Sequence, residues 1–241
     1  MKTPHFTRKP NMSRTRRWTI GFDADDTLWH NEKFFRLTQE RFADLLRDHA
    51  EADHLMERLL AAERRNLGHY GYGVKGFVLS MIETAIEVTE HRVPASVISE
   101  LIAAGQEMLS HPIELLPGVE ETIGALKGEA RLVMVTKGDL LDQERKLAQS
   151  GLGDHFDGVE IVSEKTAPVY ARIFPDAARA MMVGNSMRSD VLPAIAAGAH
   201  GVHVPHDLTW ALEAAEPPRD QPRFHRLASL AALPDLVLKL R

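Results

Sequence analysis

The chain has 241 residues, of which 44% are apolar and 26% are charged, a composition typical of a soluble globular protein with one large core and a smaller second one. Its net charge of −5 gives no sign of nucleic-acid binding, and the absence of cysteine excludes disulfides, thiolate metal sites and cysteine nucleophiles. No apolar run approaches the ~18 residues of a membrane span, and a cysteine-free chain is compatible with the cytoplasm, where we expect the protein.

Residues 1–17 are basic and lack the apolar segment of a secretory signal, so we expect a flexible, solvated tail. The chain then becomes apolar. Trp18, Ile20 and Phe22 alternate along it, which predicts a short strand that enters a core.

Three carboxylates follow this strand within four residues: Asp23, Asp25 and Asp26, with Thr27 next. So much negative charge at the end of a buried strand requires a compensating cation, and Mg²⁺ takes oxygen ligands of this kind together with substrate phosphate. Asp23 and Asp25 would share one face of a strand, so that one carboxylate could attack an electrophile while the other gives or takes a proton. The alternative is an acidic turn whose side chains cap a helix.

The next part of the chain, from residue 31 to about residue 110, repeats its apolar residues with the period of a helix and predicts four amphipathic helices. Two of these helices are expected to be joined by a loop, Asn66–Gly76, which contains four glycines. Tyr70, Tyr72 and Lys75 in this loop could stack on a substrate and meet an anionic group. The segment could equally be a linker whose tyrosines pack on the helices.

From residue 116 onward, strand patterns alternate with helix patterns, which predicts an α/β fold with a doubly wound parallel sheet. The expected strands are Leu132–Val135, Gly158–Val162, Ala180–Val183, Gly201–Val204 and Phe224–Leu227. The expected helices are Val119–Leu126, Leu140–Gln149, Pro168–Phe174, Asp190–Ala197 and Ala228–Leu240. Such sheets bind their ligands at the carboxyl ends of the strands.

Polar residues follow three of these strands. Thr136, Lys137 and Gly138 offer a hydroxyl and backbone N–H groups suited to phosphate oxygens, although Thr136 could simply cap a helix. Lys165 could offset the charge of Asp23 and of an anionic substrate, or it could be an ordinary surface lysine.

The segment that follows the predicted strand Ala180–Val183 runs from Gly184 to Asp190. It supplies an amide oxygen from Asn185 and a carboxylate from Asp190. Asp190 could also act as a helix N-cap.

Taken together and in this order, the four motifs resemble those of the haloacid dehalogenase superfamily of phosphohydrolases, over the whole stretch from Trp18 to the C-terminus. The helical insertion resembles the family's helical cap of the first type. The resemblance therefore implies a core domain made of residues 18–31 and 115–241, and an inserted helical cap domain made of residues 32–114.

The resemblance implies a role for each motif residue. Asp23 would be the nucleophile that forms an aspartyl phosphate, and Asp25 would be the general acid and base. Lys165 would steady both Asp23 and the phosphate, while Thr136 and its neighbours would bind the phosphoryl group. The expected Mg²⁺ ligands are Asp23, Asp25 through its backbone carbonyl, Asn185 and Asp190.

Two residues depart from the family pattern. Asp26 stands where the family usually has glycine, and Asn185 stands where it usually has aspartate, so that the metal site has one charge fewer.

We therefore expect a Mg²⁺-dependent phosphatase of small phosphate monoesters, monomeric or homodimeric, without a nucleic-acid or membrane partner. One alternative is a non-catalytic sensor of a phosphate ligand, against which the intact Asp23, Asp25 and Lys165 argue. The other is a 2-haloacid dehalogenase, which would not need a second acid such as Asp25.

Overall fold

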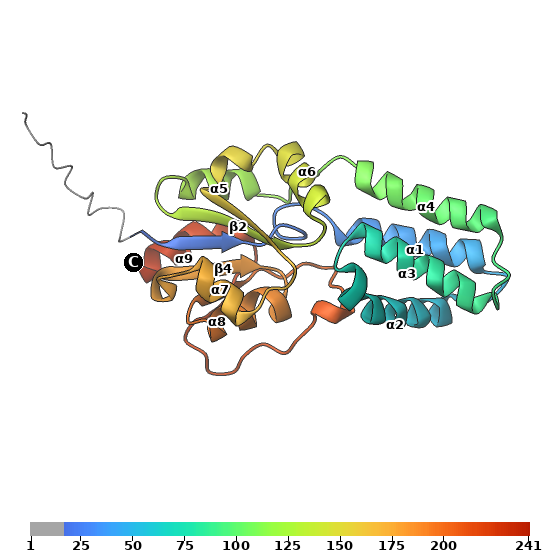
Figure 1. The fold of residues 1–241 in the computed structure, drawn as a ribbon. Coiled ribbons are helices and arrows are strands. Elements are labelled where there is room, and N and C mark those ends of the chain that lie inside the picture. The colour runs from blue at the N-terminus through green and yellow to red at the C-terminus, as the bar shows by residue number, and fades with distance from the viewer. Residues whose placement is uncertain (1–16) are drawn as a thin grey trace, which may run out of the picture.

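The computed structural model describes residues 17–241, so that the expected tail lies outside the described residues except for Arg17. Within this range the chain forms a six-stranded parallel sheet with the strand order β3-β2-β1-β4-β5-β6 (Figure 1). The strands are β1 Thr19–Phe22, β2 Arg131–Lys137, β3 Gly158–Val162, β4 Ala180–Gly184, β5 His200–His203 and β6 Phe224–Arg226. The predicted doubly wound α/β fold is confirmed.

The helices fall into two groups. The first group lies between β1 and β2 in the chain and consists of α1 Glu32–Leu46, α2 Ala52–Tyr70, α3 Val74–Val88 and α4 Ala95–Ser110. The second group surrounds the sheet and consists of α5 Val119–Leu126, α6 Leu140–Ser150, α7 Ala167–Ile173, α8 Leu192–Ala196 and α9 Leu233–Leu240. No helix in the described part of the chain is both long enough and apolar enough to span a bilayer.

The sheet is buried on both faces because its strands alternate apolar side chains between two cores. Leu132 and Met134 of β2 pack on the side covered by α5 and α9, whereas Val133 and Val135 pack on the side covered by α7 and α8. Gly21 in β1 leaves room for α7, since a Cβ at this position would lie 2.7 Å from the ring of Phe174. This arrangement fixes the strand ends, on which the site is built.

Helices α1–α4 form a bundle that extends beyond one end of the sheet and has its own apolar core (Figure 1). That core contains Phe42, Leu46, Leu55, Leu59, Phe77, Met81, Ala85 and Leu101. This bundle is the helical cap that the sequence predicts, and it stands beside the carboxyl ends of the strands.

The predicted loop Asn66–Gly76 is much shorter in the structure, because α2 continues to Tyr70 and only Gly71–Gly73 separate it from α3. The side chain of Asn66 is buried and donates hydrogen bonds to Ser80 Oγ at 3.1 Å and to Glu83 Oε2 at 2.9 Å. These contacts between α2 and α3 keep the chain helical where its glycines suggested a loop.

Other boundaries differ more modestly. β2 extends to Lys137, so that Thr136 and Lys137 belong to the strand rather than following it. The predicted helix Asp190–Ala197 begins instead with a single π-helical turn, Met187–Val191, and continues as α8. The predicted helix Ala228–Leu240 is confined to α9, whose second residue is a proline, a position where the helix needs no N–H donor.

Candidate active site

The proposed nucleophile, Asp23, follows β1 directly and extends its ladder, because its backbone N–H donates to Val183 O at 2.9 Å. Its carboxylate accepts a hydrogen bond from the Lys165 ammonium on Oδ1 and one from the Thr27 hydroxyl on Oδ2, at 3.3 Å. Burial and the nearby Asp190 carboxylate raise the pKa of Asp23 to about 7, against the opposing effect of Lys165. The strand end thus presents a nearly buried carboxylate that is held in one orientation.

Lys165 lies between two carboxylates. Its ammonium contacts Asp23 and also Asp190 Oδ1, the latter at 2.7 Å, while Asp190 Oδ2 accepts from the backbone N–H of Ser186 at 2.9 Å. Both oxygens of the fully buried Asp190 are therefore occupied. Gly184 makes this packing possible, since a Cβ there would lie 2.2 Å from Asp190 Oδ2. Asp190 consequently holds Lys165 in place. Its burial and these two contacts favour the option in which Asp190 acts on the expected metal site indirectly and not as a direct ligand.

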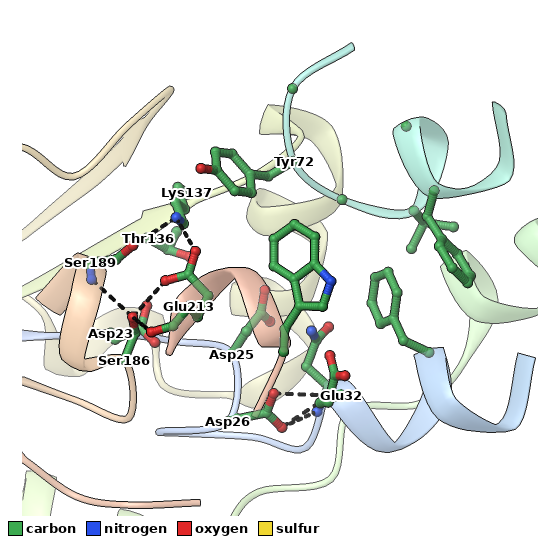
Figure 2. A pocket seen from close by; sticks show the side chains of 18 of the residues that line it. Asp23, Asp25, Asp26, Glu32, Tyr72, Thr136, Lys137, Ser186, Ser189 and Glu213 are labelled. Atoms are coloured by element: carbon green, nitrogen blue, oxygen red, sulfur yellow. Dashed lines mark hydrogen bonds and ion pairs between the residues drawn. The ribbon is translucent and has the colours of Figure 1, made fainter. Parts of the chain in front are cut away.

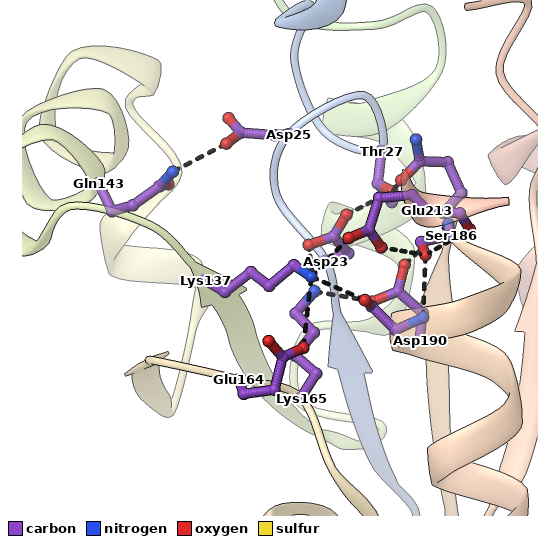
Figure 3. A network of polar contacts seen from close by, with 12 residues as sticks. Asp23, Asp25, Thr27, Lys137, Gln143, Glu164, Lys165, Ser186, Asp190 and Glu213 are labelled. Atoms are coloured by element: carbon purple, nitrogen blue, oxygen red, sulfur yellow. Dashed lines mark hydrogen bonds and ion pairs between the residues drawn. The ribbon is translucent and has the colours of Figure 1, made fainter. Parts of the chain in front are cut away.

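Asp25 is turned towards the core helix α6 rather than towards Asp23 (Figure 3). Its Oδ1 accepts from Trp29 Nε1 at 2.8 Å and from Lys146 Nζ at 3.0 Å, and its Oδ2 accepts from Gln143 Nε2 at 2.8 Å. Burial acts to raise the pKa of Asp25, but Lys146 and the three hydrogen bonds outweigh it and leave the pKa below its ordinary value. In this arrangement Asp25 is an ionised carboxylate.

Sequence reasoning missed Gln143 and Lys146, although a signal was present. The buried residues of α6 are Asp142, Gln143 and Lys146, and the buried face of an amphipathic helix is normally apolar. A polar buried face next to a predicted phosphate-binding strand end indicates residues that serve the site.

Asp26, which replaces the family's usual glycine, adopts the left-handed conformation that glycine adopts easily, with φ = 58°. Its carboxylate accepts hydrogen bonds from the backbone N–H groups of Asn31, at 2.9 Å, and Glu32, at 3.0 Å. Glu32 is the first residue of α1 and Asn31 directly precedes it, so that Asp26 caps the first helix of the bundle. Burial raises the pKa of Asp26 to about 6.

The predicted phosphate-binding residues are only partly brought together. Thr136 is buried and lines the cavity above Asp23, and Lys137 also lines it. The Lys137 ammonium donates to Ser189 Oγ at 2.8 Å and to Glu213 Oε1 at 2.6 Å (Figure 2). Gly138 does not line the cavity. Its φ is 146°, and its missing side chain leaves space for Gln143, since a Cβ added at Gly138 would lie 3.0 Å from Gln143 Nε2.

Of the three cap residues expected to contact substrate, Tyr72 lines the cavity, whereas Tyr70 and Lys75 do not. Tyr72 lines the cavity, with its ring 3.8 Å from Lys137 Nζ and its hydroxyl donating to Glu164 at 2.6 Å. Tyr70 is 46% exposed and lies outside the cavity lining, and Lys75 pairs with Asp139 of the core at 2.9 Å. Neither Tyr70 nor Lys75 lines the cavity, because the longer α2 leaves Tyr70 exposed and Asp139 holds Lys75.

A core segment that the sequence did not single out also reaches the cavity. Trp210 packs edge-on against Tyr72, with ring centroids 6.1 Å apart. Glu213, three residues later, joins Lys137 to Ser186, whose hydroxyl donates to Glu213 Oε2 at 2.5 Å. Neither residue belongs to a motif, and nothing in the local sequence indicates that this segment folds back between the core and the cap.

The oxygen atoms around Thr27 fit a hard cation. The Thr27 hydroxyl lies 3.3 Å from Asp23 Oδ2 and 3.4 Å from Asn185 Oδ1, so that one carboxylate oxygen and one amide oxygen both lie near it. Mg²⁺ prefers oxygen ligands and often takes few from the protein, with water and substrate phosphate completing its shell. Residues 17–241 contain no group of three or more His, Cys, Asp or Glu side chains able to hold a metal, in keeping with the neutral Asn185 at this place.

The family model for haloacid dehalogenase-like hydrolases matches residues 19–198. The chain belongs to the haloacid dehalogenase-like hydrolase family.

Particular relatives resemble the chain to different degrees. A haloacid dehalogenase-like family hydrolase of Xanthomonas campestris is 40% identical, with a TM-score of 0.83 over 93% of this chain and 91% of that one. The pyrimidine 5′-nucleotidase YjjG of Escherichia coli (strain K12) is 34% identical over 94 residues, which is 34% of this chain and only 41% of the relative's length. A magnesium-bound putative hydrolase of the family, YfnB from Bacillus subtilis, shares the fold, with a TM-score of 0.64, 16% identity, and 92% and 99% of the two chains covered.

Proposed function

We propose that the protein is a Mg²⁺-dependent phosphatase that hydrolyses a small phosphate monoester through an aspartyl-phosphate intermediate. One observation carries the proposal: the Asp23 carboxylate is held by Lys165 at the carboxyl end of the central strand and borders a cavity lined by Thr136. A carboxylate fixed beside a buried cation, and open to a small cavity, suits attack on a phosphoryl group.

The reaction would take two steps. In the first, Asp23 attacks phosphorus, the bond between phosphorus and the ester oxygen breaks, and the departing alkoxide takes a proton from Asp25. In the second, Asp25 removes a proton from a water molecule that attacks the aspartyl phosphate, so that inorganic phosphate leaves and Asp23 is regenerated. Asp25 would have to leave Gln143 and Lys146 and gain a proton before the first step.

Charge neutralisation supports the same proposal. Lys165 contacts Asp23 and Asp190, and in the proposed reaction its ammonium would also contact a phosphoryl oxygen. When bound, Mg²⁺ would neutralise charge on the phosphoryl group, held by Asp23, Asn185 and the backbone carbonyl of Asp25.

The decisive experiment measures phosphate release from a panel of small phosphate monoesters, with Mg²⁺ and with a chelator, for the wild type and for Asp23→Asn. We expect turnover that requires Mg²⁺ and falls at least about 10³-fold in Asp23→Asn, because a neutral amide cannot act as the nucleophile. Circular dichroism checks that the variant is folded.

The alternatives give different results in the same experiment. Binding of phosphate esters without any turnover would identify a sensor. Halide release from 2-haloacids at a rate rivalling ester hydrolysis would identify a dehalogenase. Near-normal turnover by Asp23→Asn would rule out the covalent mechanism.

A further inference from the structure

The cavity continues beyond the reacting carboxylates into a second part, which we call the leaving-group pocket. It lies between α1, α2 and the core segment that carries Trp210, and its lining includes Glu32, Phe35, Gln39 and Glu63. Figure 2 shows Glu32 across the cavity from Lys137 and Glu213. The whole cavity has a volume of about 150 Å³, below the range of ~300–1,000 Å³ that is common for drug-sized ligands, which favours a small substrate.

Two carboxyl groups are buried in this pocket. Glu32 is 7% exposed and Glu63 is 9% exposed. Glu32 contacts the half-exposed Arg36 one turn further along α1, at 3.2 Å. No basic side chain of residues 17–241 forms an ion pair with Glu63. Its carboxyl accepts a hydrogen bond from the indole N–H of Trp210, and the more distant Arg36 attracts it.

Two buried carboxyl groups with so little positive charge beside them are unfavourable when no substrate is bound. Burial, followed by the Glu32 carboxylate, raises the pKa of Glu63 to about 7, and burial raises the pKa of Glu32 to about 7 despite Arg36. Carboxyl groups that are buried without a full counter-charge destabilise a fold, and groups of this kind gather at functional sites.

The remaining charges of the cavity do not compensate the two glutamates. The three lysines that line it are each paired elsewhere: Lys137 with Glu213, Lys146 with Asp25, and Lys165 with Asp23 and Asp190. On the catalytic side, Gln143 Oε1 is a buried acceptor to which no described residue donates. The cavity therefore offers the leaving group two buried carboxyl groups that share one half-exposed arginine, whereas the three lysines that line it are each paired with other carboxylates.

We propose that the leaving-group pocket binds a protonated amine, so that the substrate is a small aminoalkyl phosphate monoester. The ammonium lies against Glu63 and Glu32, and the short carbon chain packs on Phe35 and Trp210. An ester whose alcohol carries a carboxylate is repelled by the same two glutamates. This inference rests on the proposed phosphatase function and names its substrate class.

Three esters of nearly equal size test the inference: 2-aminoethyl phosphate, 2-hydroxyethyl phosphate and phosphoglycolate. We expect wild-type kcat/KM to be highest for the amine and lowest for the carboxylate. In Glu63→Gln, kcat/KM for 2-aminoethyl phosphate should fall about tenfold, equivalent to about 1.4 kcal/mol, while that for 2-hydroxyethyl phosphate should change little. Glu57→Gln, an exposed position on the same helix, serves as the matched control.

Binding measurements separate this inference from the proposed function. Calorimetric titration of Asp23→Asn with each ester, in the presence of Mg²⁺, reports the preference of the pocket without turnover. Preferential binding of the amine with no turnover by the wild type would overturn the phosphatase proposal and support the pocket. The pocket assignment would be overturned if the three esters bound equally well, or if the hydroxyl or carboxylate ester bound best. It would also be overturned if Glu63→Gln lowered kcat/KM by the same factor for all three esters.

Discussion

Replacement of Glu63 by glutamine should make the protein more stable at neutral and alkaline pH. The substitution keeps the size and shape of the side chain and removes its charge. In the folded protein the carboxyl is 9% exposed and lies near the Glu32 carboxylate, and its pKa is raised from 4.5 to about 7.

The sign follows from proton binding. Between its ordinary pKa and about 7, Glu63 keeps its proton in the folded protein and loses it in the unfolded chain. The unfolded state therefore binds fewer protons in this window, and the free energy of unfolding falls as the pH rises through it. One pKa unit corresponds to about 1.4 kcal/mol, so that the raised pKa corresponds to a loss of about 3 kcal/mol at about pH 8.

The assay is denaturant-induced unfolding of the wild type, Glu63→Gln and Glu57→Gln at about pH 5 and about pH 8. We expect Glu63→Gln to gain about 2–3 kcal/mol relative to the wild type between the two pH values, in the transition that unfolds the cap. Glu57→Gln, which alters an exposed residue of α2, should show no such gain. If the difference between Glu63→Gln and the wild type were the same at both pH values, the folded-state carboxyl would be ionised throughout, and the argument from burial would be refuted.

Two further predictions concern the proposed metal site and Asp25. Asn185→Asp should lower the Mg²⁺ concentration needed for half-maximal phosphatase activity, because a carboxylate replaces a neutral amide oxygen; an unchanged requirement would show that Asn185 does not contact the metal. Lys146→Met should raise the pKa of Asp25, because it removes the cation that lies 3.0 Å from that carboxylate. Carboxyl-carbon NMR titration of metal-free protein measures this pKa directly, and no upward change would contradict the role given to Lys146.

Local patterns in the sequence were sufficient for the fold and for the centre of the site. Alternating strands and helices imply a parallel sheet, and the carboxyl ends of parallel strands meet at one edge, so that Asp23 and Lys165 could be placed together without coordinates. The structure confirms the sheet, and it brings these two residues into contact across 142 positions of sequence. The helical period of the insertion likewise predicted its four helices, which the family resemblance identified as a cap.

Tertiary packing decided which of the remaining polar residues serve the site. Asp190 was expected at the metal, but its two oxygens are taken by Lys165 and the backbone of Ser186. Asp25 was recognised, yet its partners Gln143 and Lys146 lie on a helix more than 100 residues away in sequence.

Long-range packing mattered most between the cap and the core, where it determined which residues reach the cavity. The glycines of residues 66–76 suggested a long substrate loop, but burial of Asn66 against α3 keeps most of it helical and turns Tyr70 away from the cavity. In the sequence, Glu63 is one polar residue among many on an amphipathic helix, and only the approach of α1 and Trp210 makes it a buried carboxyl group with a raised pKa. A local pattern can assign a side chain to a face of its helix, but what that face meets is determined by long-range packing.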